Sequence, residues 1–184
     1  PIHVLLVGPP ASAKSLFLSE VLRLRGSYPV LGGTLSKFGL LQVLVAERPT
    51  RLLVDEIEKA SGGDLAILLR LMEHGEVIYT KGNVSLREAL HCSVFAAANS
   101  LRGLPAELLS RFAIRRIDAY GQRELEDVMF HVLIHREGLG VDEAHAIAGP
   151  LSRTSHDPRD AVRAARLLKA GATSVAEALL LLGF

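Results

Sequence analysis

The residues best placed to do chemistry form one short segment near the start of the chain. In order they are Gly8, Pro9, Pro10, Ala11, Ser12, Ala13, Lys14 and Ser15. The segment connects an apolar run to an amphipathic stretch, and a loop between a strand and a helix points its backbone N–H groups at phosphates. A lysine followed by a serine suits the β- and γ-phosphates of a nucleotide and a Mg²⁺ ion. We therefore predict a phosphate loop in which Lys14 contacts phosphate and Ser15 binds Mg²⁺, with Ala13 in place of the second glycine of the usual pattern.

Two acidic residues form the second chemical signal. Asp55 and Glu56 follow the apolar run 51–54. Ligands of open α/β sheets bind beyond the carboxyl ends of the strands. At such a position Asp55 suits a water-mediated contact with Mg²⁺, and Glu56 suits the activation of an attacking water. We expect the phosphate loop and this acidic pair at the ends of neighbouring strands.

The elements that must position these residues alternate up to about residue 118. Apolar runs at 2–7, 28–31, 51–54, 94–98 and 114–117 predict strands, and the segments 15–24, 36–46, 64–73 and 106–112 predict helices. Strands separated by crossover helices form parallel sheets with helices on both faces. The stretch 76–90 instead alternates around Lys81, Gly82 and Asn83, which is typical of a β-hairpin. The predicted fold is therefore an α/β, P-loop fold with a five-stranded parallel sheet and an inserted hairpin.

Only helical patterns follow Gly121. They cover 123–137, 141–151, 158–169 and 174–182, and Asp157 is the predicted N-cap of the third. We expect two domains: an α/β base domain at 1–120, with the hairpin inserted at about 76–90, and a small helical lid domain at 121–184.

Composition narrows the classes of protein. The 184 residues suffice for one substantial core, and no apolar run approaches the roughly 20 residues that span a bilayer. The single cysteine, Cys92, excludes an internal disulfide, so we expect a reducing, cytoplasmic location. His131 and His135 lie one helical turn apart but lack a third ligand, which favours a solvated face over a metal site. A chain that begins at Pro1 without methionine is expected to be part of a longer protein.

The order of the motifs resembles that of the AAA+ ATPases over almost the whole chain. After the phosphate loop and the acidic pair come Asn99 at the end of a predicted strand, the segment 108–112 and the segment 157–160. The resemblance implies ATP and Mg²⁺ as cofactors and a homo-oligomeric, hexameric ring as the working form. It also implies that Asn99 is a sensor that positions the hydrolytic water near the γ-phosphate.

Two arginines take roles from the same resemblance. Arg111 resembles the arginine finger that acts on the ATP of the neighbouring subunit, and Arg159 resembles the second sensor, which reports the γ-phosphate to the lid. On the residues alone, Arg111 could be a solvated helix residue, and Arg163 or Arg166 could take the place of Arg159.

Two groups within this family are similar in more detail. Residues 32–37, 53–57 and 99–114 resemble the RuvB Holliday-junction motor, whereas 13–15, 72–75, 81–82 and 97–100 resemble the minichromosome maintenance helicases. Both groups carry a hairpin before the first sensor that acts on DNA. By that resemblance Lys81, together with Arg87, would contact DNA phosphates in the pore of a ring, whereas the alternative is a solvated hairpin tip.

Two working functions stay open on the sequence. The first is a DNA motor of the helicase or branch-migration type. The second is a protein remodeller of the MoxR type, favoured by the net charge of +1, since broad DNA-binding faces are usually more basic. The chain has no room after Lys169 for the DNA-gripping winged-helix domain of RuvB. A third possibility, a subunit that does not hydrolyse ATP, is disfavoured because every expected site residue is present.

Overall fold

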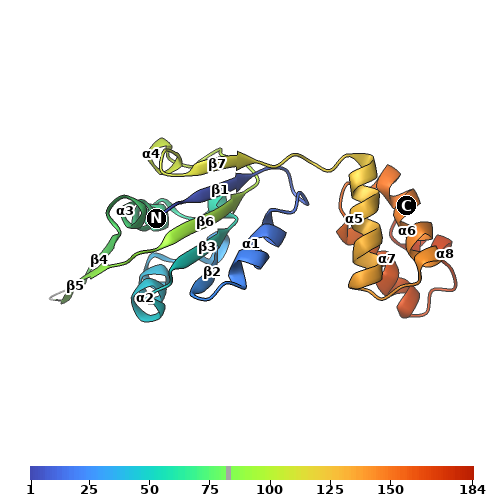
Figure 1. The fold of residues 1–184 in the computed structure, drawn as a ribbon, viewed down its shortest axis with the longest axis horizontal. Helices are drawn as coiled ribbons and strands as arrows, with labels where there is room; N and C mark the ends of the chain where they lie inside the picture. Colours follow the sequence, from blue (N-terminus) through green and yellow to red (C-terminus); the bar gives the residue numbers. More distant parts are fainter. Residues whose placement is uncertain (82–83) are drawn as a thin grey trace. The chain divides into compact units, whose positions relative to one another are not determined.

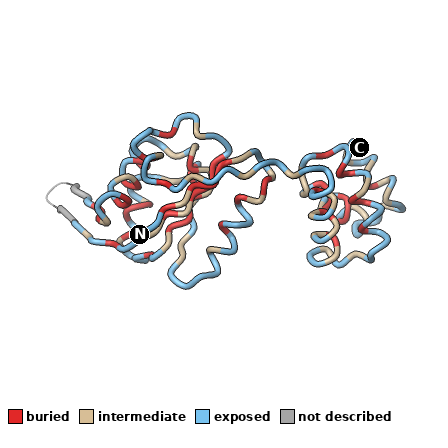
Figure 2. Tube along the Cα trace, turned by 45° about the horizontal axis from the view of Figure 1, so that its top comes forward, coloured by how far each residue is buried: buried red, intermediate tan, exposed pale blue. Residues whose placement is uncertain are grey.

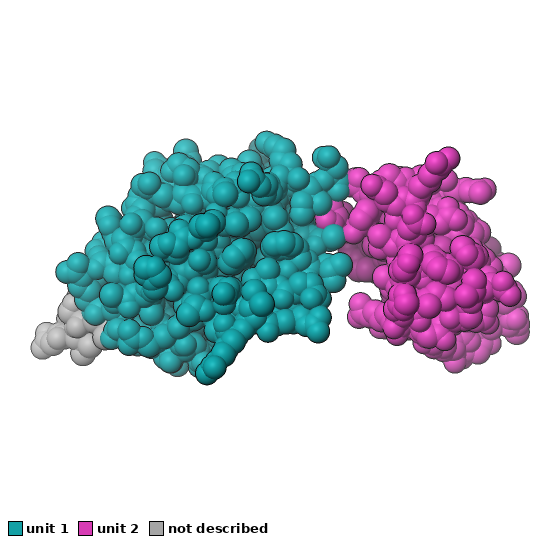
Figure 3. All heavy atoms as spheres, viewed as in Figure 1, with its two compact units in different colours: residues 1–9, 13–118 teal, residues 10–12, 119–184 magenta. Residues whose placement is uncertain are grey.

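The computed structural model describes the backbone of residues 1–81 and 84–184; within the hairpin, the side chains of residues 79–81 and 84–86 are outside the description. By contacts, the described chain divides into one unit of residues 1–9 and 13–118 and a second unit of residues 10–12 and 119–184 (Figure 3). Within the described residues, no helix is both long and apolar enough to cross a membrane. Each unit has its own buried core and is considered by itself.

A five-stranded parallel sheet is the centre of the first unit (Figure 1). Its order is β2-β3-β6-β1-β7, with the bounds Val4–Val7 for β1, Ser27–Leu31 for β2, Arg51–Asp55 for β3, Ser93–Ala98 for β6 and Ala113–Arg116 for β7. Pro29 is tolerated because β2 is an edge strand, where one side of the backbone needs no ladder partner. The predicted α/β fold with a five-stranded parallel sheet is confirmed.

Helices cover both faces of this sheet, because successive side chains of a strand point to opposite sides. Leu53 of β3 packs with Leu18 of α1 in one cluster, whereas Leu52 of the same strand belongs to the larger core built with α2, α3 and α4. The helices are α1 Lys14–Leu22, α2 Lys37–Glu47, α3 Gly62–His74 and α4 Ala106–Leu109. Figure 2 shows the buried residues concentrated along the central strands.

Serines define where two of these helices begin. The Ser36 side chain accepts the backbone N–H of Gly39 at the start of α2. Ser61 and Asp64 form a reciprocal capping box at the start of α3, in which the serine side chain accepts the N–H of Asp64 and the aspartate accepts the N–H of Ser61. These caps fix the turns that follow β2 and β3, and those turns border the predicted site.

One expectation about the sheet was wrong. The phosphate loop and the acidic pair follow β1 and β3, but these strands are not neighbours, since β6 pairs with both. Val94 and Ala96 of β6 are fully buried, and this apolar strand fills the centre of the sheet. The consequence is that Asn99, which follows β6, lies at the sheet edge between the two motifs.

The predicted hairpin is an antiparallel ribbon that extends away from the sheet (Figure 1). It consists of β4 Glu76–Lys81 and β5 Val84–Ala89, while Gly82 and Asn83 of the predicted turn lie outside the described residues. Gly75 ends α3 in the left-handed conformation at φ 63°, and its carbonyl accepts the N–H of Leu90. Buried Val77 anchors the base of the ribbon in the core.

The second unit is helical. Its helices are α5 Gln122–His135, α6 Val141–Thr154, α7 Arg159–Lys169 and α8 Val175–Leu181, packed around buried Met129, Leu133, Ile147 and Leu151. Asp157 accepts the backbone N–H of Arg159 at 2.9 Å, so it caps α7 although the regular helix begins one residue later than predicted. The roles of 1–120 as a nucleotide-binding base and 121–184 as its lid stay predictions.

Candidate nucleotide site

The phosphate-loop lysine is held in place by its own loop. Lys14 is the first residue of α1, and its Nζ donates to the carbonyl oxygens of Gly8 at 2.9 Å and Pro9 at 2.6 Å. The residue is buried, and burial lowers the pKa of its ammonium group, while the negative charges of Asp55 and Glu58 act in the opposite direction. A cation is thus fixed at the amino end of a helix, where a bound phosphate would meet it.

Two alanines of the loop have unusual backbone angles. Ala11 has φ 62° and Ala13, the N-cap of α1, has φ 63°. This left-handed region favours glycine, which is the residue the usual loop pattern has at position 13. The loop therefore keeps a glycine-like backbone with an alanine side chain.

The predicted metal ligands meet across the sheet edge. Ser15 Oγ donates to Asp55 Oδ2 at 2.7 Å, although their strands are separated by β6. The other oxygen, Asp55 Oδ1, accepts the backbone N–H of Glu56 at 2.9 Å. A hydroxyl and a carboxylate are ligands that suit Mg²⁺, which usually takes the rest of its shell from water and substrate phosphates. Among the described residues, no group of three or more His, Cys, Asp or Glu side chains is placed to hold a metal ion.

Glu56 lies at a strained turn. Its backbone is left-handed at φ 53°, and its Oε1 accepts a hydrogen bond from Lys59 Nζ at 2.8 Å. The Glu56 carboxylate raises the pKa of the Lys59 ammonium. Gly32, at the end of β2, allows this turn, because a Cβ there would lie 2.2 Å from the Glu56 carbonyl oxygen.

Asn99 is the first residue after β6. Its backbone N–H donates to Glu58 Oε1 at 3.0 Å, and the other oxygen of that carboxylate is buried. Glu58 and Lys59 were not among the site residues predicted from the sequence. The only available signal was their position directly after the acidic pair, which also fits two solvated residues.

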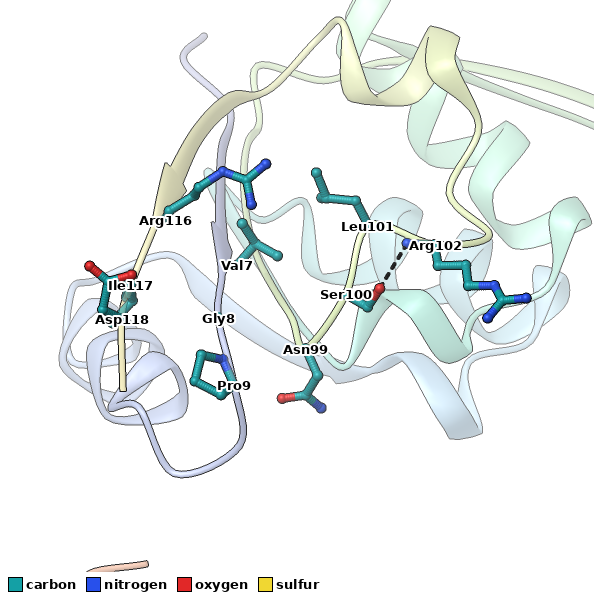
Figure 4. Close-up of a pocket in the computed structure, with 10 residues that line it drawn as sticks. All are labelled: Val7, Gly8, Pro9, Asn99, Ser100, Leu101, Arg102, Arg116, Ile117 and Asp118. Carbon is teal, nitrogen blue, oxygen red and sulfur yellow. Dashed lines mark hydrogen bonds between the residues drawn. The ribbon is translucent and has the colours of Figure 1, made fainter. Parts of the chain in front are cut away.

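A cavity of about 520 Å³ opens beside the phosphate loop, within the first unit (Figure 4). Its walls come from the carboxyl ends of three neighbouring strands: residues 7–9 at the end of β1, 99–102 after β6, and 116–118 at the end of β7. Figure 4 shows Arg116 pointing toward Val7, and the Ser100 hydroxyl accepting the backbone N–H of Arg102. This volume is within the range of ligand pockets, and the cavity contains Asn99 and the start of the loop.

The predicted arginine finger lies apart from this cavity. Arg111 follows α4, and its Nη2 forms an ion pair with Glu73 Oε1 at the end of α3. Phe112 beside it is buried, so the backbone is anchored while the guanidinium is about half exposed. The ion pair limits where the guanidinium can point.

Arg159 begins α7 in the second unit. Its Nε and Nη2 contact Asp157 Oδ2 at 2.9 and 2.6 Å. This arginine lowers the pKa of the Asp157 carboxyl group, chiefly by hydrogen bonding. Arg159 therefore has a local partner within its own unit.

The two DNA-contact candidates differ in what is described. Lys81 is the last residue of β4, and its side chain is outside the described part of the hairpin. Arg87 Nε donates to Glu76 Oε2 at 2.6 Å, and Arg70 donates to the other oxygen at 2.5 Å. Hydrogen bonds from Arg87 and then Arg70 lower the pKa of Glu76. Arg87 thus ties the two strands of the hairpin together through Glu76, and Glu76 joins them to Arg70 in α3.

The chain is similar in sequence to DNA replication licensing factors and in fold to RuvB. No family model matches it. Maternal DNA replication licensing factor mcm3 of Xenopus laevis is 30% identical over 171 residues, covering 73% of this chain and 21% of that protein. DNA replication licensing factor MCM3 of Gallus gallus is 30% identical over 174 residues, with the same coverage. Two variants of Thermotoga maritima RuvB superpose with TM-scores of 0.70 and 0.71 at 20% and 21% identity, covering 97% of this chain and 60% of theirs.

The sheet order, the phosphate loop and the acidic pair define a P-loop core with the AAA+ fold. The resemblance to the AAA+ ATPases, and within them to RuvB and the minichromosome maintenance proteins, is confirmed by these relatives. The chain spans about a fifth of the length of the curated relatives it matches, with 21% of the first of them covered.

Proposed function

We propose that this chain is the ATP-binding and ATP-hydrolysing core of an AAA+ motor that works as a homo-oligomeric ring. The observation that carries the proposal is the 2.7 Å hydrogen bond between Ser15 and Asp55, which joins the phosphate loop to the acidic pair. Lys14, fixed over the same loop, would bind the β- and γ-phosphates. Ser15 and, through water, Asp55 would hold Mg²⁺, which neutralises charge on the phosphate oxygens when bound.

Glu56 and Asn99 are the residues proposed to act on the attacking water. Glu56 follows Asp55 directly, and Lys59 donates to its Oε1, which leaves Oε2 as the oxygen that would accept the proton of the water. Asn99 lies between the two motifs because β6 separates their strands, which is where a side chain could contact both water and γ-phosphate. Arg159 is proposed to report the γ-phosphate to the helical unit.

Separate measurements of binding and turnover test the ATPase assignment. Glu56→Gln should keep its affinity for a fluorescent ATP analogue and lose turnover by roughly 10²-fold or more, because general-base catalysis is worth about that much. Lys14→Ala should lose both properties. Glu47→Gln, an exposed change at the end of α2, should alter neither. Wild-type turnover in Glu56→Gln would overturn the role of this site.

Assembly is the second part of the proposal. If Arg111 acts on the ATP of a neighbouring subunit, it supplies on the order of 10³–10⁵ in rate, as arginine fingers of GTPases do. Turnover per subunit should then rise steeply with protein concentration, and a constant value from dilute to concentrated protein would contradict the role in trans.

DNA is the proposed polymer. The relatives are DNA replication licensing factors and RuvB, and the hairpin β4–β5 ends near Lys81. ATP turnover should rise with single-stranded, duplex or four-way-junction DNA, and Lys81→Ala should abolish that rise while keeping the basal rate. The preferred DNA form would separate a helicase from a branch-migration motor.

A protein remodeller of the MoxR type is the second candidate. The net charge of +1 favours it, as does the engagement of Arg87 with Glu76, which leaves fewer basic side chains for DNA. Turnover that ignores every DNA form, but rises with a protein that co-purifies with the chain, would select this function.

A further inference from the structure

Glu58 joins two parts of the candidate site that are distant in the sequence. It lies in the short 3₁₀ turn Ile57–Lys59, and its Oε1 accepts the backbone N–H of Asn99 at 3.0 Å. Its other oxygen, Oε2, is buried and has no hydrogen-bond partner among the described residues. A solvated surface glutamate would have neither feature.

The geometry of the sheet explains why a side chain makes this contact. The ladder between β3 and β6 has its last aligned pair at Val54 and Ala96, and the chain after β3 turns away at left-handed Glu56. The backbone N–H of Asn99 therefore has no strand to pair with on that side, and an unpaired backbone donor is costly when it leaves water. Glu58 extends the pairing by one bond, with its carboxylate in place of a backbone carbonyl.

The buried oxygen of Glu58 that has no hydrogen bond among the described residues, Oε2, indicates a positive charge nearby. A carboxylate oxygen that lacks a hydrogen bond is tolerated when a positive charge lies near it. The negative charge of Glu58 acts on the Lys14 ammonium and raises its pKa, against the larger effect of burial. Glu58 thus interacts with the phosphate loop on one side and with the residue after β6 on the other.

We propose, on the basis of the ATPase function proposed above, that Glu58 is a positioning residue. It holds Asn99 where the asparagine side chain can contact the γ-phosphate of bound ATP. It contacts no reacting atom itself. Its hydrogen bond fixes the backbone from which the Asn99 side chain projects. Glu58 therefore affects the rate of the chemical step more than the affinity for nucleotide.

Three variants separate this role from a purely structural one. Glu58→Ala removes the acceptor, and kcat should fall by about tenfold or more with KM and the affinity for a fluorescent ATP analogue within about twofold. Glu58→Gln keeps an amide oxygen that can accept the Asn99 N–H, so it should retain most of kcat. Glu47→Ala is the exposed control and should behave as the wild type.

Amide hydrogen exchange at Asn99 tests the contact without any turnover. The Asn99 N–H should exchange slowly in the wild type and in Glu58→Gln, and at least about tenfold faster in Glu58→Ala. Unchanged exchange and unchanged kcat in Glu58→Ala would overturn the proposal, as would an equal loss of kcat in the Gln and Ala variants. A wild-type chain that hydrolyses no ATP would instead contradict the proposed function, and the exchange data would still decide the role of Glu58.

Discussion

Backbone strain is concentrated at the candidate site. Among the described residues, the non-glycine positions with positive φ are Ala11, Ala13, Arg48 and Glu56, and all of these except Arg48 belong to the site motifs. Residues held in sparsely populated backbone regions cost about 1–3 kcal/mol each and tend to cluster where function requires them. The strain supports the assignment of the site independently of any motif.

Replacing Ala13 by glycine should stabilise the protein. At φ 63° an alanine is about 1 kcal/mol worse than glycine, and the larger entropy of an unfolded glycine offsets part of this, so the gain should be about 0.5 kcal/mol. Urea unfolding measures it. Ala66→Gly, in the exposed middle of α3, should destabilise by about 1 kcal/mol. A loss of stability in Ala13→Gly would contradict the strained loop.

The sequence predicted those site residues that have a motif around them. Lys14 and Ser15 could be named from the loop pattern between an apolar run and a helical segment, and Asp55 from its place at the end of an apolar run. Asn99 could be named from the resemblance to the AAA+ ATPases. Glu58 and Glu73 could not, because their partners lie 41 and 38 residues away along the chain and an isolated acidic residue usually indicates a solvated one. Such contacts depend on the folded backbone and leave no periodic signal.

At the scale of elements, the turn after β2 supports the turn after β3. Gly32 is buried in the 3₁₀ turn Gly32–Thr34, and its Cα lies directly against the Glu56 backbone. The position of Glu56, the proposed water-activating residue, therefore depends on the absence of a side chain at Gly32.

Gly32→Ala should damage both stability and turnover. The new Cβ would lie 2.2 Å from the Glu56 carbonyl oxygen, and such overpacking costs about 1–3 kcal/mol. Gly33→Ala is the matched control, because its Cβ would meet only the Lys59 side chain at 3.6 Å or more. Urea unfolding and ATP turnover measure the two effects. If the two variants had the same stability and the same ATP turnover, the claim that the turn at Gly32 supports Glu56 would be wrong.

The residue ranges of the strands could be predicted from the sequence, but the order of the strands in the sheet could not. The strands were found as apolar runs bounded by polar turns, since burial on both faces leaves a continuous signal. The position of β6 between β1 and β3 depends on which strands pair in the folded sheet, and Val94 and Ala96 would fit any central position. Periodicity within one strand carries no information about its neighbours.

At the scale of the whole molecule, a buried histidine links the two central strands. His3 precedes β1, and its Nδ1 accepts the backbone N–H of Val94 in β6 at 3.0 Å. Only 7% of the residue is exposed, and burial lowers the pKa of its imidazole from the usual 6.5. The folded state therefore keeps His3 neutral at pH values where the unfolded chain protonates it.

Stability should consequently decrease in mild acid. Below pH 6.5 the unfolded state binds a proton that the folded state resists, so the free energy of unfolding falls as the pH drops through this value. His3→Asn keeps an acceptor for Val94 and should reduce the change in stability between about pH 7 and 5. His91→Asn, at an exposed site, should not. Urea unfolding at several pH values measures both, and an identical slope in His3→Asn would contradict the buried neutral imidazole.

Mixing two inactive variants tests the central claim, an ATPase site completed by a neighbouring subunit. Glu56→Gln and Arg111→Ala should each hydrolyse little ATP alone, since one lacks the proposed base and the other the proposed arginine finger. An equimolar mixture should regain roughly a quarter of wild-type turnover, because a random ring interface combines an intact Glu56 with an intact Arg111 that often. Wild-type turnover in either variant alone, or a mixture as inactive as its components, would contradict the account.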